Sequence, residues 1–531
     1  MKQHVLAVDL GTSGPKVALV TLDGQVLLHE FRPNRLLLAA GGAAEQDPEE
    51  WWQTIRDAIQ AILSKNAAAA GEIAALSISS QWFGTVPVDA RGRHLANAWI
   101  WLDQRGAPYV AERVGGGLEV PGTGYNAWRL WRWIRLTGAV PSRTGKDPVG
   151  HILGIKHERP ELYRATYKFL EPMDYLTFRL TGRATASYAS ITGYFCTDNR
   201  DLERVDYDRE LLSLCGLDRE KLPDLIPTGS VVGPLTPECA RELGLPEDVK
   251  VVTSSADTAS AAIGAGAVQD YRAHLYIGTS AWISCHVPFK RTDLTRSIAS
   301  LPSAIPDRYW VATEQDAAGK CLSWLVERVL YGPDELASEE APADVYARLD
   351  RVAERAPAGS GGLLFLPWLN GERTPVDDRH IRGSWANLSL ATDRGCLVRS
   401  VLEGVALNAR WMLRAAEHFV ARECPAGFES LRFVGGGARS ELWCQILSDV
   451  LDRRIERVKE PVLANARGAA LIAAVALGHL DWKSAAAKVE VDRVYQPNPA
   501  VRALYDRKFE AFLRFYKQTK GTYAWLNGDV S

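Results

Sequence analysis

The chain has 531 residues, of which 47% are hydrophobic and 24% are charged. At about 100–200 residues per domain, this length is enough for two sizeable hydrophobic cores. The 62 Lys and Arg residues nearly balance the 64 Asp and Glu residues, which argues against a surface that tracks nucleic acid or anionic lipid. The 17 Trp, 17 Tyr and 13 Phe residues exclude low-complexity disorder, because such side chains build cores.

Membrane and export signals are not found in the sequence. No apolar run reaches the roughly 18 residues of a membrane span, since Arg467 interrupts the closest candidate at 464–480. The first residues lead directly into a strand-like run, so we expect no signal peptide and a cytoplasmic protein. The eight cysteines form no CxxC pair and no metal-ligand spacing with histidine. We therefore expect buried free thiols and no disulfide framework.

The first half of the chain alternates strands, turns and one long helix. Residues 5–9, 16–21 and 26–30 predict three strands, joined by a turn at 11–14 and by the hairpin signal at 23–24. Asp47, Pro48 and Glu50 predict a helix start with a capping box. A further strand follows at 75–80, and another at 249–253 leads into an alanine-rich helix.

The second half repeats this order. Residues 272–277, 282–287 and 309–314 predict three strands, and 319–330 predicts a helix; later strands at 363–366 and 431–434 alternate with helices at 394–419 and 440–451. A Gly-Thr-Ser turn stands at 11–13 and again at 278–280, each between two strands. A tripeptide match alone could be coincidence, but the shared context predicts one α/β architecture used twice, with a ligand cleft between the copies.

The first turn carries side chains that suit phosphate. Asp9 ends a strand and is followed by Thr12, Ser13 and Lys16. Phosphate oxygens accept from N–H groups, hydroxyls and an ammonium group, and Mg²⁺ takes a carboxylate with several waters. A hairpin turn with a surface lysine is the alternative interpretation. The turn is not a Walker A loop, because GxxxxGK[ST] occurs nowhere in the chain.

Two further segments join a strand to a helix. Asp257 lies at such a junction, where a carboxylate could accept a proton, but on these residues alone an ordinary helix N-cap is the better explanation. Residues 435–437 are three glycines in a row; since one glycine suffices for a tight turn, three favour close approach of a ligand. Residues 128–135 alternate Trp and Arg and predict an amphipathic helix with a basic outer face.

Taken in order, these segments resemble the FGGY carbohydrate kinases over nearly the whole chain, in their xylulokinase-like form. Residues 9–16 resemble the first phosphate loop of the family, 101–105 its W-x-D-x-R segment and 255–258 the segment of its catalytic aspartate. Residues 276–280 resemble the second phosphate loop, 366–375 the C-terminal signature and 435–440 the adenosine motif.

The resemblance implies an actin-like fold of two ribonuclease-H-like domains, 1–265 for sugar and the first phosphate loop and 266–531 for ATP. It implies ATP-dependent phosphorylation of a ketose, such as xylulose or ribulose, or of a related polyol. Asp257 would be the general base and Asp9 would hold Mg²⁺. The implied ATP contacts are Thr12, Ser13, Lys16, Gly278, Thr279, Gly319, Gly436, Gly437, Ala438 and Ser440. The implied sugar-side residues are Gln81, Trp82, Phe83, Asp103, Asp257 and Thr258. Whether the protein forms a homodimer is left open.

The chain departs from the family pattern at three places, all of which bear on the sugar and none on the phosphate loops: residues 82–83, the blurred Pro-x-x-Lys stretch at 150–156, and the missing second glycine at 384–388. Xylulokinases carry a Met-His pair where this chain has Trp82 and Phe83. We therefore expect these rings to set the sugar pocket and D-xylulose not to be the best substrate; simple core packing of both rings is the alternative. A non-kinase actin-like ATPase and a non-catalytic sugar sensor are the competing functions, and the presence of both Asp9 and Asp257 argues against the sensor.

Overall fold

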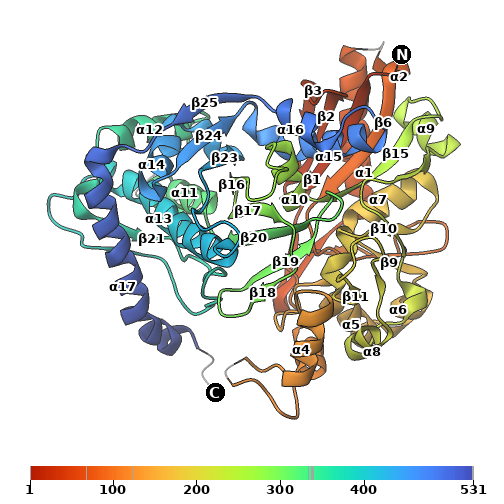
Figure 1. The fold of residues 1–531 in the computed structure, drawn as a ribbon, viewed down its shortest axis with the longest axis horizontal. Helices are drawn as coiled ribbons and strands as arrows, with labels where there is room; N and C mark the ends of the chain where they lie inside the picture. The colour runs from red at the N-terminus through yellow and green to blue at the C-terminus, as the bar shows by residue number, and fades with distance from the viewer. Residues whose placement is uncertain (1, 67–68, 122, 333, 336–339, 529–531) are drawn as a thin grey trace.

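The computed structural model describes residues 2–66, 69–121, 123–332, 334–335 and 340–528. Two large sheets, each flanked by helices, dominate the fold (Figure 1). We call residues 2–265 the N-lobe and residues 266–528 the C-lobe. The N-lobe sheet has the strand order β14-β15-β6-β1-β2-β3. Its strands are β14 (Val231–Pro234), β15 (Lys250–Ala256), β6 (Ile73–Ser80), β1 (His4–Gly11), β2 (Gly14–Thr21) and β3 (Val26–Phe31).

The C-lobe sheet has the order β18-β19-β20-β17-β16-β23-β24-β25. In both sheets three antiparallel strands are followed by two strands that run parallel to the first, which confirms that one architecture is used twice. The strands are β18 (Thr292–Asp293), β19 (Ile298–Pro302), β20 (Tyr309–Gln315), β17 (Ala281–Val287), β16 (Ala273–Ile277), β23 (Ser430–Val434), β24 (Arg454–Val458) and β25 (Val491–Tyr495).

The predicted start of the first helix is right, but its capping box is wrong. Helix α1 (Pro48–Lys65) begins after Asp47, whose side chain accepts from the Glu49 N–H at 2.8 Å. Glu50 does not reach back to the cap. Its carboxylate accepts instead from the Arg35 N–H and the Arg35 guanidinium, both at 3.0 Å. The local sequence pattern did not determine the partner of Glu50, because Arg35 offers a competing donor that is distant in sequence but close in space.

The second half differs from the prediction in two details. The short strands β18 and β19 intervene between the predicted second and third strands. The predicted helix at 319–330 is an α-helix only over α11 (Gly319–Trp324), and it continues as a π-helical segment over Leu325–Leu330. Such segments are rare and recur at functional sites.

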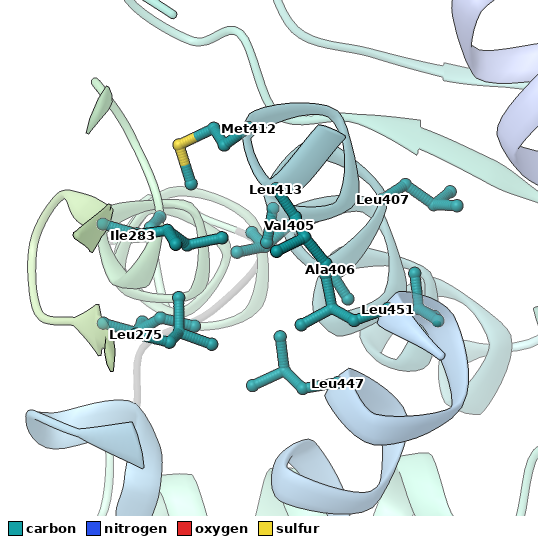
Figure 2. Packing of buried hydrophobic residues seen from close by; sticks show 14 of the residues in the cluster. Leu275, Ile283, Val405, Ala406, Leu407, Met412, Leu413, Leu447 and Leu451 are labelled. Carbon is teal, nitrogen blue, oxygen red and sulfur yellow. The ribbon is translucent and has the colours of Figure 1, made fainter. Parts of the chain in front are cut away.

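The largest core fills the C-lobe, where α13 (Arg394–Val420) and α14 (Glu441–Leu451) pack on the sheet. Figure 2 shows Leu275 and Ile283 of the sheet facing Val405 of α13 and Leu447 of α14. Each fully buried side chain of this size contributes about 1.5–3 kcal/mol relative to exposure. Helix α17 (Arg502–Asn527) adds Phe509 and Phe512 to the same core.

Smaller helices complete both lobes. They are α2 (Ala69–Glu72), α3 (Ala107–Val114), α4 (Ala127–Leu136), α5 (Pro148–Glu158), α6 (Pro160–Ala165), α7 (Pro172–Thr181), α8 (Arg209–Cys215), α9 (Pro237–Leu243), α12 (Val345–Glu354) and α16 (Trp482–Ala487). Helix α4 is amphipathic as predicted, with Trp133 buried and Trp128 and Trp131 exposed. All eight cysteines are free and seven of them are buried, as expected. In the described ranges no helix is long and apolar enough to span a membrane.

Two helices lie between the sheets and join the lobes: α10 (Asp257–Gly264) and α15 (Ala464–Ala476) (Figure 1). Their backbones approach so closely that side chains do not fit. A Cβ on Gly264 would lie 1.7 Å from the Ala464 carbonyl oxygen, and one on Gly468 would lie 1.9 Å from that of Ser260. Helix α15 also packs a row of alanines on the N-lobe sheet, although it comes late in the chain.

We predict that Gly468→Ala destabilises the protein by about 1–3 kcal/mol, because the added methyl group must push the two helices apart. The matched control is Gly521→Ala in α17, where nothing lies within 4 Å of the added atom. That change is expected to be neutral or to stabilise by about 0.5–1 kcal/mol. Thermal and urea unfolding of both variants measures the difference. Equal stability of the two variants would contradict the close packing.

Candidate active site

The site lies where the first turn of the N-lobe meets α10 and the C-lobe sheet. The register of β1 and β2 pairs Asp9 with Lys16, so both side chains point to the same face of the sheet. Lys16 is near Asp257 of α10 and Tyr276 of β16. The structure therefore brings together the residues that the sequence predicted for the first turn and for the strand–helix junction.

Asp9 is 2% exposed, and each of its carboxylate oxygens accepts one hydrogen bond from a side chain. Its Oδ2 accepts from Lys16 Nζ at 3.1 Å, and its Oδ1 accepts from Asn465 Nδ2 at 3.3 Å. The carboxylate raises the pKa of Lys16 to about 12, so this lysine stays charged at neutral pH. Asn465 opens α15 and was missed by the sequence analysis, because 456 positions separate it from Asp9.

Asp257 is the first residue of α10 and does not cap it: the N-cap residue is Ala256, and the alternative interpretation of the sequence is wrong. Its Oδ1 accepts from the Thr258 N–H at 2.8 Å. Burial is the main cause that raises the pKa of Asp257 to about 7; the charges of Asp9 and Glu314 add to it, and Lys16 opposes it. A carboxyl group with this pKa exchanges a proton near neutral pH, as a general base must.

Thr258 brings an unused polar atom to the same place. Its side-chain hydroxyl oxygen is buried, and no described residue gives it a hydrogen-bond partner. Buried polar atoms are nearly always satisfied in folded proteins, so an orphan beside Asp257 points to a bound ligand.

Thr12 is fixed by a chain of polar side chains. Its hydroxyl donates to Gln81 Oε1 at 3.0 Å and accepts from Trp101 Nε1 at 2.9 Å. Gln81 Nε2 donates to Gln46 Oε1 at 2.7 Å, and Gln46 Nε2 returns to the Thr12 carbonyl at 2.8 Å. Ser13, at the tip of the turn, is exposed. The network holds the turn in one conformation, and the sequence analysis missed Gln46.

Trp82 and Phe83 stack on each other, with ring centroids 4.6 Å apart and an interplanar angle of 9°. Trp82 packs against Ala259 and Ala262 of α10, and its Nε1 donates to the Ser190 carbonyl at 3.0 Å. Phe83 has a positive φ of 61°, which is unusual for an aromatic residue. Both rings are half-buried, so they form part of the wall beside α10.

Asp103 is fully buried, and its carboxylate is not accessible to a ligand. It accepts from the Ala44 N–H at 2.9 Å and from the Arg105 guanidinium at 2.6 Å. Arg105 also donates to Glu45 at 2.6 Å and stacks 3.6 Å over the Trp99 ring. The carboxylate therefore positions Arg105 and the adjoining loop.

The second turn is tied to α11. The Thr279 carbonyl accepts from the Ala318 N–H at 2.9 Å and the Lys320 N–H at 3.1 Å, which leaves the exposed Thr279 side chain at the turn. A Cβ on Gly319 would lie 2.2 Å from the Gly278 carbonyl oxygen. Glycine at this position allows the helix to start directly against the turn.

The three consecutive glycines have different roles. Gly435 has a φ of +94°, and a Cβ there would lie 2.4 Å from the Ile277 carbonyl oxygen. A Cβ on Gly437 would lie 2.9 Å from the Ile277 side chain, whereas nothing lies within 4 Å of one on Gly436. Two glycines are thus required by the fold itself, and only Gly436 faces open space. The remaining predicted residues support the loop: Ala438 is buried, and Ser440 caps α14 through the Trp443 N–H at 3.0 Å.

Three charged residues of the same region were missed by the sequence analysis. Glu314 and Arg373 of the C-lobe pair at 2.7 Å while remaining 37% and 36% exposed. Lys146 of the N-lobe makes no side-chain hydrogen bond or ion pair with any described residue. Burial and the nearby Arg373 lower the pKa of Lys146. No local pattern marks this lysine, because its neighbours come from the other lobe.

Known proteins resemble the chain along its whole length. The N-terminal and C-terminal domain models of the FGGY family of carbohydrate kinases match residues 4–115 with 140–264 and residues 274–477. The xylulose kinase of Bacillus subtilis (strain 168) is 28% identical over 524 residues, 98% of this chain and 97% of that protein. The gluconokinase of the same organism is 27% identical over 494 residues, 91% and 89% of the two chains. The solved structure of ligand-bound xylulose kinase from Lactobacillus acidophilus has a TM-score of 0.83 at 25% identity, covering 98% of this chain and 99% of that one. These matches confirm the predicted fold class of two actin-like domains.

Proposed function

Because the chain belongs to the FGGY family of carbohydrate kinases and is an ATP-dependent sugar kinase, we propose that Asp257 takes the proton from the attacked sugar hydroxyl. The observation that carries this proposal is the pKa of about 7 that burial and the neighbouring Asp9 give to Asp257. A base with this pKa is about half ionised at neutral pH, is increasingly ionised above it, and still accepts a proton readily. The unpartnered Thr258 hydroxyl beside it can hold the sugar in place.

The two turns would hold the phosphates of ATP. Lys16, Thr12 and Ser13 of the first turn and Gly278 and Thr279 of the second supply an ammonium group, hydroxyls and N–H groups. Phosphoryl transfer depends on positioning and on neutralising charge more than on covalent help from the protein. The network that fixes Thr12 meets the first of these needs, and the permanent charge of Lys16 meets the second.

The carboxylates of the site suit Mg²⁺, a cation that needs few ligands from the protein. In the described part of the chain no group of three or more His, Cys, Asp or Glu residues could enclose a metal. Mg²⁺ typically takes one or two carboxylates and completes its shell with water and phosphate oxygens. Asp9, held by Lys16 and Asn465, would be its protein ligand, and the ion would supply charge neutralisation for the phosphates.

The nucleotide would lie on the C-lobe. Gly436 leaves open space for a flat ligand next to the second turn. Gly319 lets α11 begin directly against this turn, where the Thr279 side chain stays exposed. Gly437, Ala438 and Ser440 would act by shaping this loop. The sugar would then approach from the N-lobe, with Asp257 between the two substrates.

The sugar would be a ketose or a related polyol lying against Trp82 and Phe83, with Gln81 beside it and Asp103 acting through Arg105. An aromatic face suits the C–H side of a sugar chain and offers no hydrogen bond to a hydroxyl. A second candidate is an acidic sugar, favoured by the unpartnered Lys146 near Arg373. The names of the relatives include both kinds of substrate, xylulose and gluconate.

We predict that Asp257→Asn lowers sugar-dependent ADP release about 10²–10⁴-fold while ADP binding is retained. In the wild type, kcat/KM should fall about tenfold per pH unit below about pH 7, because the protonated Asp257 cannot accept the hydroxyl proton. A coupled ADP assay and calorimetric ADP titration measure both quantities. Near-wild-type turnover of the variant, or a profile that is flat down to pH 5, would exclude Asp257 as the base.

A second prediction concerns the C-lobe. Thr279→Val and Gly436→Val should raise the KM for ATP strongly and the KM for the sugar little, because both positions face the proposed nucleotide site. The matched control is Gly521→Ala, remote from both turns. The lobe assignment is wrong if the main effect of both variants is on sugar affinity.

A third prediction concerns the sugar. Across a panel of pentuloses, polyols and aldonates, D-xylulose should not be the best substrate, and the double variant Trp82→Met, Phe83→His should change the ranking. Leaving a sugar hydroxyl without a hydrogen-bond partner beside Phe83 would cost about 1–3 kcal/mol of binding free energy. The histidine of the double variant would restore the hydrogen bond.

The same panel separates the two substrate candidates. Lys146→Met should raise the KM of aldonates selectively if an acidic sugar is the substrate, and should leave neutral sugars unaffected. The proposal for Trp82 and Phe83 is wrong if D-xylulose is the best wild-type substrate or if the double variant leaves the ranking unchanged. The two rings would then serve only in core packing.

A further inference from the structure

A cavity of about 360 Å³ lies at the seam between the lobes, away from the site of phosphoryl transfer. It is lined by Ile134, Arg135, Arg200, Lys290, Arg291 and Thr292. Four of these six side chains are cationic and none is acidic. Its volume is within the range of small-molecule sites, about 300–1,000 Å³. Such a lining recruits an anion, because like charges gathered around a partly desolvated space repel one another.

Lys290 is the best-placed of the four cations. Its Nζ donates to the Ile134 carbonyl at 2.7 Å and to the Arg135 carbonyl at 2.9 Å, both at the end of α4. An ammonium group has three donors, so one remains for a ligand. Burial lowers the pKa of Lys290 to about 8; the charge of Asp198 opposes this shift, and that of Arg200 adds to it. A bound anion would stabilise the charged form of Lys290 and so offset the effect of burial.

The charges of the cavity do not cancel. Arg200 pairs with Asp198 at 2.6 Å, and Arg291 pairs with Glu423 at 2.6 Å. Among the described residues Lys290 forms no ion pair, and the Arg135 guanidinium forms none either; it lies over the Trp131 ring, 5.2 Å from the ring centroid. Two cations therefore remain without a carboxylate partner. A phosphate monoester, which carries a charge near −2 at neutral pH, matches that excess.

A second cavity of about 410 Å³ shares Arg291 and Thr292 with the first and is also lined by Asp293, Leu294, His418 and Phe419. Asp293 is paired with Arg296 at 2.8 Å, and Leu294 and Phe419 offer apolar surface. The first cavity therefore suits the anionic end of a ligand, and the second suits a less polar body. The phosphoryl group would lie among the cations and the organic part would extend toward Phe419.

The walls of the first cavity come from both lobes. Arg135 and Arg200 belong to the N-lobe, and Lys290 and Arg291 to the C-lobe just before β18; Figure 1 shows α4, β11 (Thr197–Asp198) and β18 at the same edge of the molecule. The Thr292 hydroxyl also donates to the Gly138 carbonyl across the seam at 2.6 Å. A ligand that binds both walls stabilises one relative orientation of the lobes and thereby biases the cleft between them.

We propose that this seam cavity binds a phosphorylated small metabolite and that binding there is coupled to the catalytic cleft through the orientation of the lobes. The inference is independent of which sugar the kinase phosphorylates, since none of its residues belongs to the proposed sugar or nucleotide sites.

Calorimetric titration of the full-length protein, with saturating ADP in the nucleotide site, tests the proposal. Glucose 6-phosphate is the probe, and glucose at the same ionic strength is the neutral comparison. We expect binding of the phosphate ester only, with the dissociation constant raised about tenfold by Arg135→Gln and by Lys290→Met. The matched control is Arg132→Gln on the same helix, whose side chain pairs with Asp208 and Glu210 outside the cavity.

Arg135→Gln keeps the test decisive if Lys290→Met destabilises α4, because Arg135 makes no hydrogen bond that the fold needs. In kinetic assays the ester should shift the KM of the wild type for sugar or ATP at least about twofold, and Arg135→Gln should keep its basal activity and lose the shift. Equal affinity of wild type, cavity variants and control would overturn the site. Binding that leaves both KM values unchanged would overturn the coupling.

Discussion

The packing of α10 on α15 is the constraint on which the rest of the site depends. The two backbones touch through Gly264 and Gly468, at distances that no Cβ could tolerate. One helix begins with Asp257, and the other carries Asn465, the partner of Asp9. Because interiors are close-packed, a shift of either helix would move the general base relative to the first phosphate turn. Two glycines with no polar role thus fix the geometry of the proposed proton transfer.

Electrostatics follows from that geometry. Asp9 and Asp257 are both acidic and lie close together, but different groups donate hydrogen bonds to their carboxyl groups. Asp9 is held by Lys16 and Asn465, whereas among the described residues a single backbone N–H, that of Thr258, donates to the side chain of Asp257. Burial and the charge of Asp9 raise the pKa of Asp257 to about 7. A carboxyl group with this pKa can exchange a proton near neutral pH, which is the role proposed for Asp257.

Local signals in the sequence were sufficient for the elements and for the two turns, because strand alternation, turn residues and helix caps act over a few positions. They also drew attention to Asp9 and Thr279 in the two turns. Asp257 was singled out by the family resemblance, because its local pattern alone favoured a helix N-cap. Local signals could not locate Asn465 or Lys146, since the contacts of these residues cross from one lobe to the other. The glycine run 435–437 illustrates a different limit: its composition indicated ligand contact, but the structure needs two of the three glycines to pass Ile277. The capping box failed for a similar reason, because Arg35 offered Glu50 a better donor.

The two copies of the architecture place the same Gly-Thr-Ser turn in different chemical surroundings. Asp9 and Tyr276 occupy the same place, two residues before the glycine of each Gly-Thr-Ser turn. On the neighbouring strand, Asp9 pairs with Lys16 and Tyr276 pairs with Trp282. The N-lobe turn is therefore backed by an ion pair, and the C-lobe turn by two rings stacked 3.9 Å apart at an angle of 3°. Burial raises the pKa of Tyr276 to about 12, so the ring stays neutral and adds no charge near Lys16. An apolar wall opposite the ion pair strengthens every charge interaction in the cleft, because it excludes the water that would screen them.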